Sequence, residues 1–262
     1  MRTVGCLLFV ALLVLLSFPL SRAESLSFAV VSDTHVRVSS DNRFYTDFIR
    51  AIEEQKINTI FHIGDAIDRP GSMNQWNRFF EITGQDKTVH LAPGNHDIRG
   101  KKSLAVYLGL FPRSYYSIPD GDTLFVLLNT ELPGEEGSVA GDQFAWLQTE
   151  IKKPFRYKFV FLHEPLFPVV PLHGLDRQQT ARDRLHRLFR KEGVSLVISG
   201  HDHLYNRIEK DGIIYVIAGG GGDYALFAES NCYILVVKTP KGYAFAVKDL
   251  QGAVMDKFSV SR

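Results

Sequence analysis

Short apolar runs recur along the chain, and five of them end at a cluster of Asp, His or Asn residues. The runs are Phe28 to Val31, Thr59 to Ile63, Val89 to Ala92, Phe159 to Leu162 and Leu196 to Ile198. Their length and their Val, Ile and Phe content are typical of buried strands. In open α/β sheets, ligands bind at the carboxyl ends of the strands. We therefore expect the polar stretches that follow these strands to converge on one site.

Segments with apolar residues at helical spacing lie between these strands. The pattern predicts helices from a cap at Asp41 and Asn42 to about Gln55, from Met73 to Ile82, from about Asp142 to Lys152, and from Arg177 to Glu192. The first half of the chain thus alternates strand and helix. This order indicates right-handed crossovers and a largely parallel sheet.

The middle and the end of the chain have a different pattern. Asp120-Gly121-Asp122 separates two apolar runs and predicts a hairpin. Loops are expected at Arg99 to Arg113, Pro133 to Gly141 and Pro165 to Asp176, and the chain after Ser199 is rich in short strands. We predict one α/β domain over residues 24–262, in which two mixed β-sheets pack face to face and are flanked by helices.

The first 23 residues have the pattern of a secretory signal peptide. Arg2 supplies the positive charge, Val4 to Leu16 is apolar, and Ser21-Arg22-Ala23 places small residues before a cleavage site at Glu24. An uncleaved membrane anchor is the alternative, although the apolar run is shorter than the roughly 20 residues that span a bilayer. We expect a secreted or periplasmic protein with no stable membrane association after cleavage.

The composition is that of an ordinary globular protein, with 45% hydrophobic and 23% charged residues. The net charge is +1, from 30 basic and 29 acidic residues, and it becomes −1 (28 − 29) if Arg2 and Arg22 are removed. No basic block suggests a nucleic-acid partner. The mature chain keeps one cysteine, Cys232, so no internal disulfide can form, and we expect this thiol to be buried and inert.

The polar stretches contain the residue types that bind divalent cations. They are Ser32-Asp33-Thr34-His35, Gly64-Asp65-Ala66-Ile67-Asp68, Gly94-Asn95-His96-Asp97, His163-Glu164-Pro165 and Gly200-His201-Asp202-His203. Asp33 and His35 are two residues apart, as are His201 and His203, so on an extended segment each pair leaves the same face. One such pair is weak evidence, but the stretches hold five of the nine histidines. Asp, His and Asn together favour cations of intermediate hardness.

These motifs, in this order, resemble the metallophosphoesterase (calcineurin-like phosphoesterase) superfamily. The series is Asp-x-His, Gly-Asp-x-x-Asp, Gly-Asn-His-Asp, a lone His and Gly-His-x-His, and it covers nearly all of the mature chain. Ser-Asp-Thr-His together with Pro-Gly-Asn-His-Asp most resembles the branch that contains the bacterial class III cyclic-nucleotide phosphodiesterases.

The resemblance implies a site with two divalent metal ions, which could be Mn, Zn or ferrous Fe. One ion would be held by Asp33, His35, Asp65 and His203, and the other by Asn95, His163, His201 and the shared Asp65. A hydroxide that bridges the metals would then attack phosphorus in line. His96 would face the substrate as proton donor or electrostatic contact. Asp68 resembles the carboxylate that orients this histidine in phosphoprotein phosphatases, and Asp97 is the other candidate.

Departures from related branches narrow the interpretation. Purple acid phosphatases have a tyrosine where this chain has Asp68, so we do not expect a purple ferric site. Arg69 follows Asp68 as in the Asp-Arg-Gly motif of phosphoprotein phosphatases and is a candidate phosphate contact, but Pro70 alters the turn.

Three neighbouring features have simpler interpretations. Asp202 is expected to point away from the metals and brace a loop. Gly219 to Gly222 is expected to form a tight loop near His203. His173, in the proline-rich loop before the last helix, is treated as non-functional, and contact with the substrate is the alternative.

Together these features predict an exported, dinuclear-metal phosphoesterase for small phosphodiesters or phosphomonoesters, with nucleotides among the candidates. The alternatives are a phosphoprotein phosphatase and a non-catalytic metal- or phosphate-binding protein of the same fold. An enzyme is favoured because every ligand position of the family pattern is filled and His96 is present.

Overall fold

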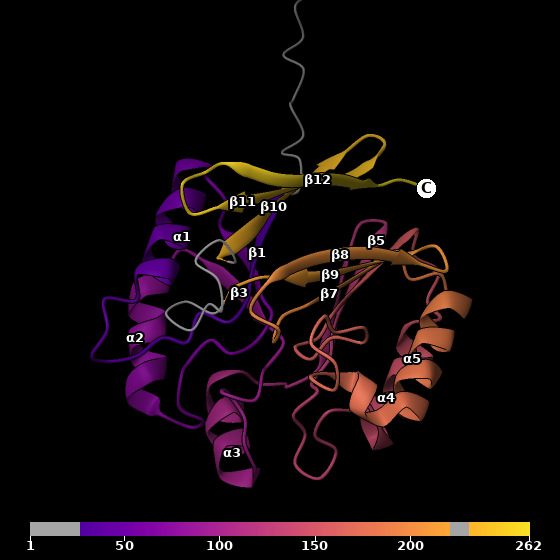
Figure 1. The fold of residues 1–262 in the computed structure, drawn as a ribbon, viewed down its shortest axis with the longest axis horizontal. Helices are drawn as coiled ribbons and strands as arrows, with labels where there is room; N and C mark the ends of the chain where they lie inside the picture. The colour runs from indigo at the N-terminus through magenta and orange to yellow at the C-terminus, as the bar shows by residue number, and fades with distance from the viewer. Residues whose placement is uncertain (1–26, 221–230) are drawn as a thin grey trace, which may run out of the picture.

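Two mixed six-stranded β-sheets lie face to face in the centre of the computed structural model, which describes residues 27–220 and 231–262 (Figure 1). The predicted signal peptide, residues 1–23, and two of the four glycines at 219–222 lie outside these ranges. Within them, no helix is both long and apolar enough to cross a membrane.

The first sheet has the strand order β12-β11-β10-β1-β2-β3. Its parallel strands are β1 (Ser27–Val31), β2 (Thr59–His62) and β3 (Thr88–Leu91). An antiparallel extension consists of β10 (Cys232–Thr239), β11 (Gly242–Asp249) and β12 (Val254–Val260). The parallel half, which is the half predicted from the strand–helix alternation, is the part that ends at the polar motifs.

The second sheet has the order β4-β5-β6-β7-β9-β8. Its parallel centre is β5 (Thr123–Leu127), β6 (Tyr157–Phe161), β7 (Leu196–Ser199) and β9 (Ile213–Ala218). The antiparallel edges are β4 (Tyr116–Asp120) and β8 (Tyr205–Lys210). The β4–β5 pair is the hairpin predicted at Asp120-Gly121-Asp122.

Helices cover the outer face of each sheet (Figure 1). On the first sheet lie α1 (Arg43–Glu54), α2 (Met73–Thr83) and α3 (Lys101–Leu110). On the second lie α4 (Gly141–Glu150) and α5 (Gln179–Lys191), the latter preceded by the short 3-10 helix η1 (Leu175–Gln178). The predicted architecture, with two mixed sheets flanked by helices, is therefore confirmed.

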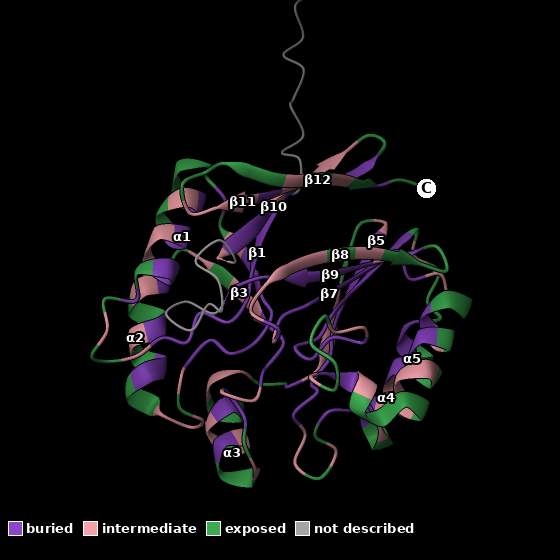
Figure 2. Cartoon of the chain, in the orientation of Figure 1, coloured by how far each residue is buried: buried purple, intermediate pink, exposed green. Residues whose placement is uncertain are grey.

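The space between the sheets is filled largely by aromatic rings. Phe61 of β2 stacks on Phe161 of β6 with ring centroids 4.6 Å apart, and Phe28 and Phe125 lie 4.9 and 5.1 Å from Phe61. Figure 2 shows the central strands mostly buried, the edge strands β8 and β12 partly exposed, and the helices exposed along their outer sides. Burying each such ring contributes about 1.5–3 kcal/mol. This layer holds the ends of β1, β2 and β6 in fixed relative positions.

Two elements were missed by the sequence pattern. Residues 99–113 were expected to be a loop, but Lys101–Leu110 forms α3, whose apolar residues are spread around the helix so that Tyr107 alone of its large side chains is fully buried. Strand β8 follows the Gly-His-x-His motif, and charged residues make up half of its sequence, as is common in an exposed edge strand. Neither has the one-sided pattern by which elements are predicted.

Of the two predicted cap residues of α1, Asp41 accepts the N–H of Arg43 at 3.2 Å, whereas Asn42 does not cap the helix. Asn42 stands at the start of α1, but its φ is +53° and its side chain makes no hydrogen bond to the helix. Its amide instead bonds back to Arg37, accepting from the main-chain N–H at 2.8 Å and donating to the carbonyl at 2.9 Å. The side chain thus closes the loop that leads away from β1.

Candidate metal centre

Main-chain hydrogen bonds join the loops that follow the parallel strands. The N–H groups of Asp33 and His35 donate to the carbonyls of Gly64 and Asp65, each at 2.9 Å. The carboxylate of Asp33 accepts a hydrogen bond from the N–H of His201 at 3.1 Å. These contacts bring the loops after β1, β2 and β7 to one place.

The first group of candidate ligand atoms comes from Asp33, His35, Asp65 and His203, and these atoms lie within 4.8 Å of one another. Nε2 of His35 is 3.2 Å from Nε2 of His203, and the latter is 3.5 Å from Oδ1 of Asp33. A cation with metal–ligand bonds of about 2.0–2.2 Å holds neighbouring ligand atoms roughly 3–3.5 Å apart. The spacing therefore fits one cation.

The second group comes from Asp65, His163 and His201, again within 4.8 Å. Nε2 of His163 lies 3.1 Å from Nδ1 of His201 and 3.2 Å from Oδ1 of Asn95. Oδ2 of Asp65 is 3.4 Å from this nitrogen and 3.8 Å from Nε2 of His35. One carboxylate oxygen thus faces both groups. All the side chains that the sequence assigned to two metals are brought together.

The environment of His163 fits a metal ligand. Its Nδ1 lies 2.8 Å from the carbonyl of Ile63, and because a carbonyl can only accept, this nitrogen carries the proton. In the neutral imidazole, Nε2 is then the nitrogen with the lone pair, and it faces Asp65, Asn95 and His201. Histidine ligands of metals are oriented by such a second hydrogen bond.

The charges of the site also suit cations. Burial lowers the pKa of His35 to about 4 and that of His201 to about 3, so both imidazoles are neutral, as metal binding requires. Burial alone would raise the pKa of Asp33 and Asp65, but the neighbouring histidines together outweigh it and lower both. At Asp33 these are the hydrogen bond and charge of His203 and the charge of His163, and at Asp65 the charge and hydrogen bond of His163 with the charges of His35 and His96.

His163 differs from the other two imidazoles. Burial alone would lower its pKa, but the charge and hydrogen bond of Asp65, together with the charges of Asp33 and Glu131, outweigh burial and raise it well above the ordinary value. A cation at this position therefore displaces a proton.

The backbone at the ligands is turned rather than extended, which corrects the assumption made from the two-residue spacing. The ligand residues with a positive φ are Asp33 (55°), His35 (43°), Asp65 (53°), His201 (72°) and His203 (50°). Such values are uncommon outside glycine and cost of order 1–3 kcal/mol each. Because strain of this kind clusters at functional sites, it supports a functional role for these side chains.

His96 lies beside the first group. Its main-chain N–H donates to Oδ1 of Asp65 at 2.7 Å, and its Nδ1 lies 2.7 Å from the main-chain carbonyl of Asp68. The Asp68 carboxylate, which was predicted to orient this ring, has an oxygen within 4.8 Å of a ring nitrogen of His96 and lies 3.3 Å from Nε of Arg37. The hydrogen bond given by the structure thus runs to the carbonyl of Asp68.

The other two candidates for contacts near His96 are placed differently. Asp97 is buried, and its carboxylate accepts from the N–H groups of Ala66 at 3.0 Å, Ile67 at 3.3 Å and Gly94 at 2.9 Å, which braces the ligand loops. The side chain of Arg69 is exposed, while its N–H donates to Gln75.

A cavity of about 260 Å³ opens onto both groups. Its lining residues are Asp65, Asn95, His96, His173, His201, Asp202 and His203. His173, which the sequence analysis set aside, stacks on His201 with ring centroids 4.2 Å apart and lies 2.8 Å from Oδ1 of the buried Asp202. Oδ2 of Asp202 accepts from the N–H groups of Val169 and Val170, so this residue braces the proline-rich loop as predicted. A lone histidine in such a loop gives no local signal of this placement.

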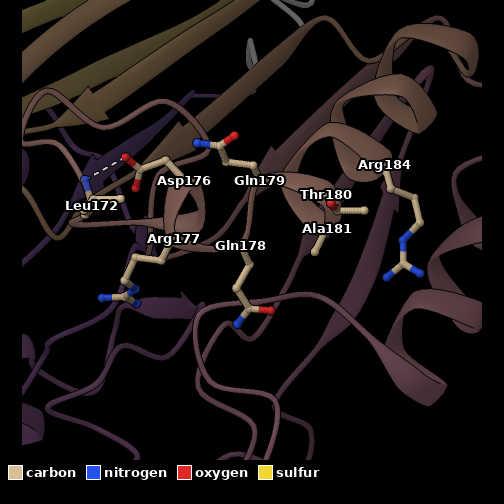
Figure 3. Close-up of a pocket in the computed structure, with 8 residues that line it drawn as sticks. All are labelled: Leu172, Asp176, Arg177, Gln178, Gln179, Thr180, Ala181 and Arg184. Carbon is tan, nitrogen blue, oxygen red and sulfur yellow. Dashed lines mark hydrogen bonds between the residues drawn. The ribbon is translucent and has the colours of Figure 1, made fainter.

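A larger hollow of about 600 Å³ is lined by Leu172 and by residues of η1 and α5 (Figure 3). Leu172 lines it, whereas the next residue, His173, lines the metal cavity. Two charged side chains of the hollow already have partners, since Asp176 accepts from the N–H of Leu172 at 2.7 Å and Arg177 donates to Glu164 at 2.5 Å. We therefore assign the chemistry to the smaller cavity.

Gly220, the last described residue of the predicted glycine loop, approaches the end of β1. A Cβ at Gly220, where φ is +105°, would overlap the carbonyl of Ser32 and lie 3.3 Å from Cβ of Asp33. The loop thus approaches the site at Asp33, whose carboxylate lies 3.5 Å from Nε2 of His203, and the rest of the predicted loop lies outside the described residues.

Gly94 lies where a side chain would displace the shared carboxylate. A Cβ there would overlap Oδ1 of Asp65 and come within 2.8 Å of His163. We predict that Gly94→Ala removes most of the bound metal, measured by elemental analysis after dialysis. Gly109→Ala in α3, where a Cβ meets nothing within 4 Å, is the control and should keep it. Full metal content in Gly94→Ala would contradict this geometry.

Comparisons with known proteins identify the family and the fold. A family model described as calcineurin-like phosphoesterase matches residues 26–205. A search of curated protein sequences finds no match. Among solved structures, purple acid phosphatase PPD1 from yellow lupin (Lupinus luteus) seeds has a TM-score of 0.71 at 18% identity, over 91% of this chain and 54% of that one. This chain thus spans about half the length of the lupin protein.

Two further structures cover more of their own length. GAP50, the anchor in the inner membrane complex of Plasmodium, has a TM-score of 0.70 at 15% identity, over 90% of this chain and 89% of that one. A dimetal phosphatase from Danio rerio has a TM-score of 0.66 at 13% identity, over 90% and 98%. At such identities these likenesses show the fold. The family model covers more than half of the sequence, and the chain therefore belongs to the calcineurin-like phosphoesterase family.

Proposed function

We propose that this protein hydrolyses small phosphate esters with two divalent cations held by Asp33, His35, Asp65, Asn95, His163, His201 and His203. One observation carries the proposal: a single oxygen of Asp65 faces both groups of ligand atoms, which lie side by side at one cavity. Bound there, the cations supply Lewis acidity and lower the pKa of a bound water. The mixed nitrogen and oxygen donors suit Mn, Zn or ferrous Fe.

His96 is the proposed proton donor to the leaving oxygen. Its Nδ1 is engaged by the carbonyl of Asp68, so Nε2 is the nitrogen that can face a substrate in the cavity. A fixed ring with one free nitrogen can pass a proton to an oxygen within hydrogen-bond reach, which contributes typically 10²–10⁴-fold in rate, to order of magnitude. The main-chain N–H of His96 also donates to Asp65, and this hydrogen bond fixes the position of His96 relative to the shared ligand.

His173 is proposed as a second contact to the substrate, from a different loop. Asp202 is 1% exposed and holds Nδ1 of His173, which leaves Nε2 available, while about 44% of the His173 side chain stays exposed. An imidazole anchored in this way can bind a phosphoryl oxygen beside the metals. The small cavity favours a compact ester, and the motif resemblance adds cyclic nucleotides to the esters worth testing.

The direct test uses protein produced from the full sequence, stripped with chelator and reloaded with Mn, Zn or Mg. Turnover of bis(p-nitrophenyl) phosphate, p-nitrophenyl phosphate and a cyclic nucleotide is then compared. We expect metal-restored turnover, reduced about 100-fold or more in Asn95→Ala and His96→Ala. Arg50→Gln, which removes a surface ion pair on α1, should behave as wild type.

The ratio of the first two rates separates a diesterase from a monoesterase. Two metals bound per chain with no turnover of any of these esters would sink the proposal and favour a binding protein of this fold.

His173→Ala provides a narrower test. We predict a loss of about 10-fold or more in kcat/KM with unchanged metal content, because the ring touches substrate without ligating metal. Leu172→Ala, at the adjacent and largely exposed position, is the matched control and should change kcat/KM less than twofold, to order of magnitude. Equal values for His173→Ala and wild type would remove His173 from the site.

Export is the second part of the proposal, supported by the charge and hydropathy pattern of residues 1–23. The mass of the protein recovered outside the cytoplasm should correspond to a chain that begins at Glu24. Recovery of the intact chain with Met1 from the membrane fraction would show instead that the segment is an anchor.

A further inference from the structure

We propose that Arg37 is a positioning residue for His96. Arg37 binds the carboxylate of Asp68 and thereby holds the main-chain carbonyl of Asp68, which in turn fixes the His96 ring. The inference rests on the proposed function, in which His96 donates a proton. It identifies the residues that orient the His96 ring.

Among the described residues, a hydrogen bond and a ring contact place the His96 ring. Its Nδ1 lies 2.7 Å from the carbonyl of Asp68, and its edge meets the ring of His35 with centroids 4.6 Å apart at 89°. This carbonyl accepts the hydrogen bond of Nδ1, so a shift of the carbonyl rotates the ring and turns Nε2 away from the cavity. A misplacement of about 1 Å can cost on the order of 100-fold in rate.

The carbonyl of Asp68 belongs to a short segment that is held from both sides. After it, the N–H of Arg69 donates to the Gln75 side chain at 2.7 Å. Before it, the N–H of Asp68 reaches the carbonyl of Val36 at a long 3.3 Å. The contact between Nε of Arg37 and Oδ1 of Asp68 at 3.3 Å adds a second link between the same two segments.

The Arg37–Asp68 pair is shielded from solvent. The side chains are 25% and 13% exposed, whereas the surface pair of Arg43 and Asp47 on α1 is 79% and 22% exposed. Exposed pairs contribute little because water and salt screen them, but a partly buried pair is screened less. The Arg37–Asp68 charge contact is therefore screened less than the surface pair, as the proposed role requires.

Arg37 is itself clamped at its main chain. Asn42, which is buried and has a φ of +53°, binds both the N–H and the carbonyl of Arg37 and forgoes capping α1 to do so. This clamp fixes the Cα of Arg37 two residues after His35. Arg37 is not among the described residues that line the 260 Å³ cavity, so its route to the chemistry runs through Asp68 and His96.

The kinetic test compares the Arg37→Gln variant, His96→Ala and the double variant, each metal-loaded, on two esters of the same class. One ester releases p-nitrophenolate, and the other releases phenolate. Phenolate is more basic, so its departure depends more strongly on a proton donor. We expect Arg37→Gln to lower kcat about 10-fold more for the phenyl ester than for the nitrophenyl ester, with KM and metal content unchanged.

In the His96→Ala background, adding Arg37→Gln should have less than about a twofold effect, because the ring it acts on is gone. Equal losses on both esters, a rise in KM alone, or losses that multiply with His96→Ala would each overturn the proposal.

A second measurement does not depend on turnover. Histidine ¹⁵N NMR of the zinc-loaded protein should show an Nδ1–H signal that disappears in His96→Ala and is protected from exchange in wild type. Arg37→Gln should lose that protection, and Arg50→Gln should keep it. An unchanged signal in Arg37→Gln overturns the proposal about Arg37, whatever the ester assays show. A lack of activity in the ester assays counts against the proposed function and not against the role of Arg37.

Asp68→Asn breaks the same ion pair from its other end while leaving the carbonyl in place. It is expected to show the same loss of protection and the same leaving-group dependence. It replaces Arg37→Gln if that variant fails to fold, as judged by its circular dichroism and thermal unfolding. Wild-type behaviour in a folded Asp68→Asn variant overturns the proposal.

Discussion

The buried carboxylate of Asp65 is the group on which the rest of the site depends. Oδ1 accepts the N–H of His96, while Oδ2 faces His163 at 3.4 Å and His35 at 3.8 Å. Burying a charge costs several kcal/mol unless it is compensated. The surrounding donors, and cations when they are bound, supply that compensation. The loops that contribute the ligands therefore lie around this one residue.

This arrangement requires backbones to pass very close to the ligands. Gly94 and Gly64 lie against Asp65 and His163 so closely that a Cβ at either would overlap neighbouring atoms, and Gly200 lies equally close to Ser32 and Asp33. Several ligand residues also adopt left-handed backbone angles that cost free energy. Such strain persists because a rigid frame imposes it. The aromatic layer between the two sheets provides that frame, since it fixes the strand ends from which the loops emerge.

Much of this could be predicted from the sequence, because buried parallel strands leave a strong apolar signal and their ends carry the polar motifs. The sheet-on-sheet architecture and the convergence of Asp33, Asp65 and His201 followed from that pattern. Residues whose role depends on side-chain contacts across loops could not be predicted. His173 is placed by Asp202, and Asn42 turns back to Arg37 although its position suggests a helix cap. Helix α3 and strand β8 lack one-sided patterns because solvent or charged residues occupy most of their surface.

The dinuclear interpretation is tested most directly by anomalous X-ray diffraction from crystals of the protein loaded with Mn or Zn. Two anomalous peaks should appear, one on each side of Oδ2 of Asp65, the first among Asp33, His35 and His203 and the second among Asn95, His163 and His201. A single peak, or peaks away from Asp65, would contradict a site built on a shared carboxylate.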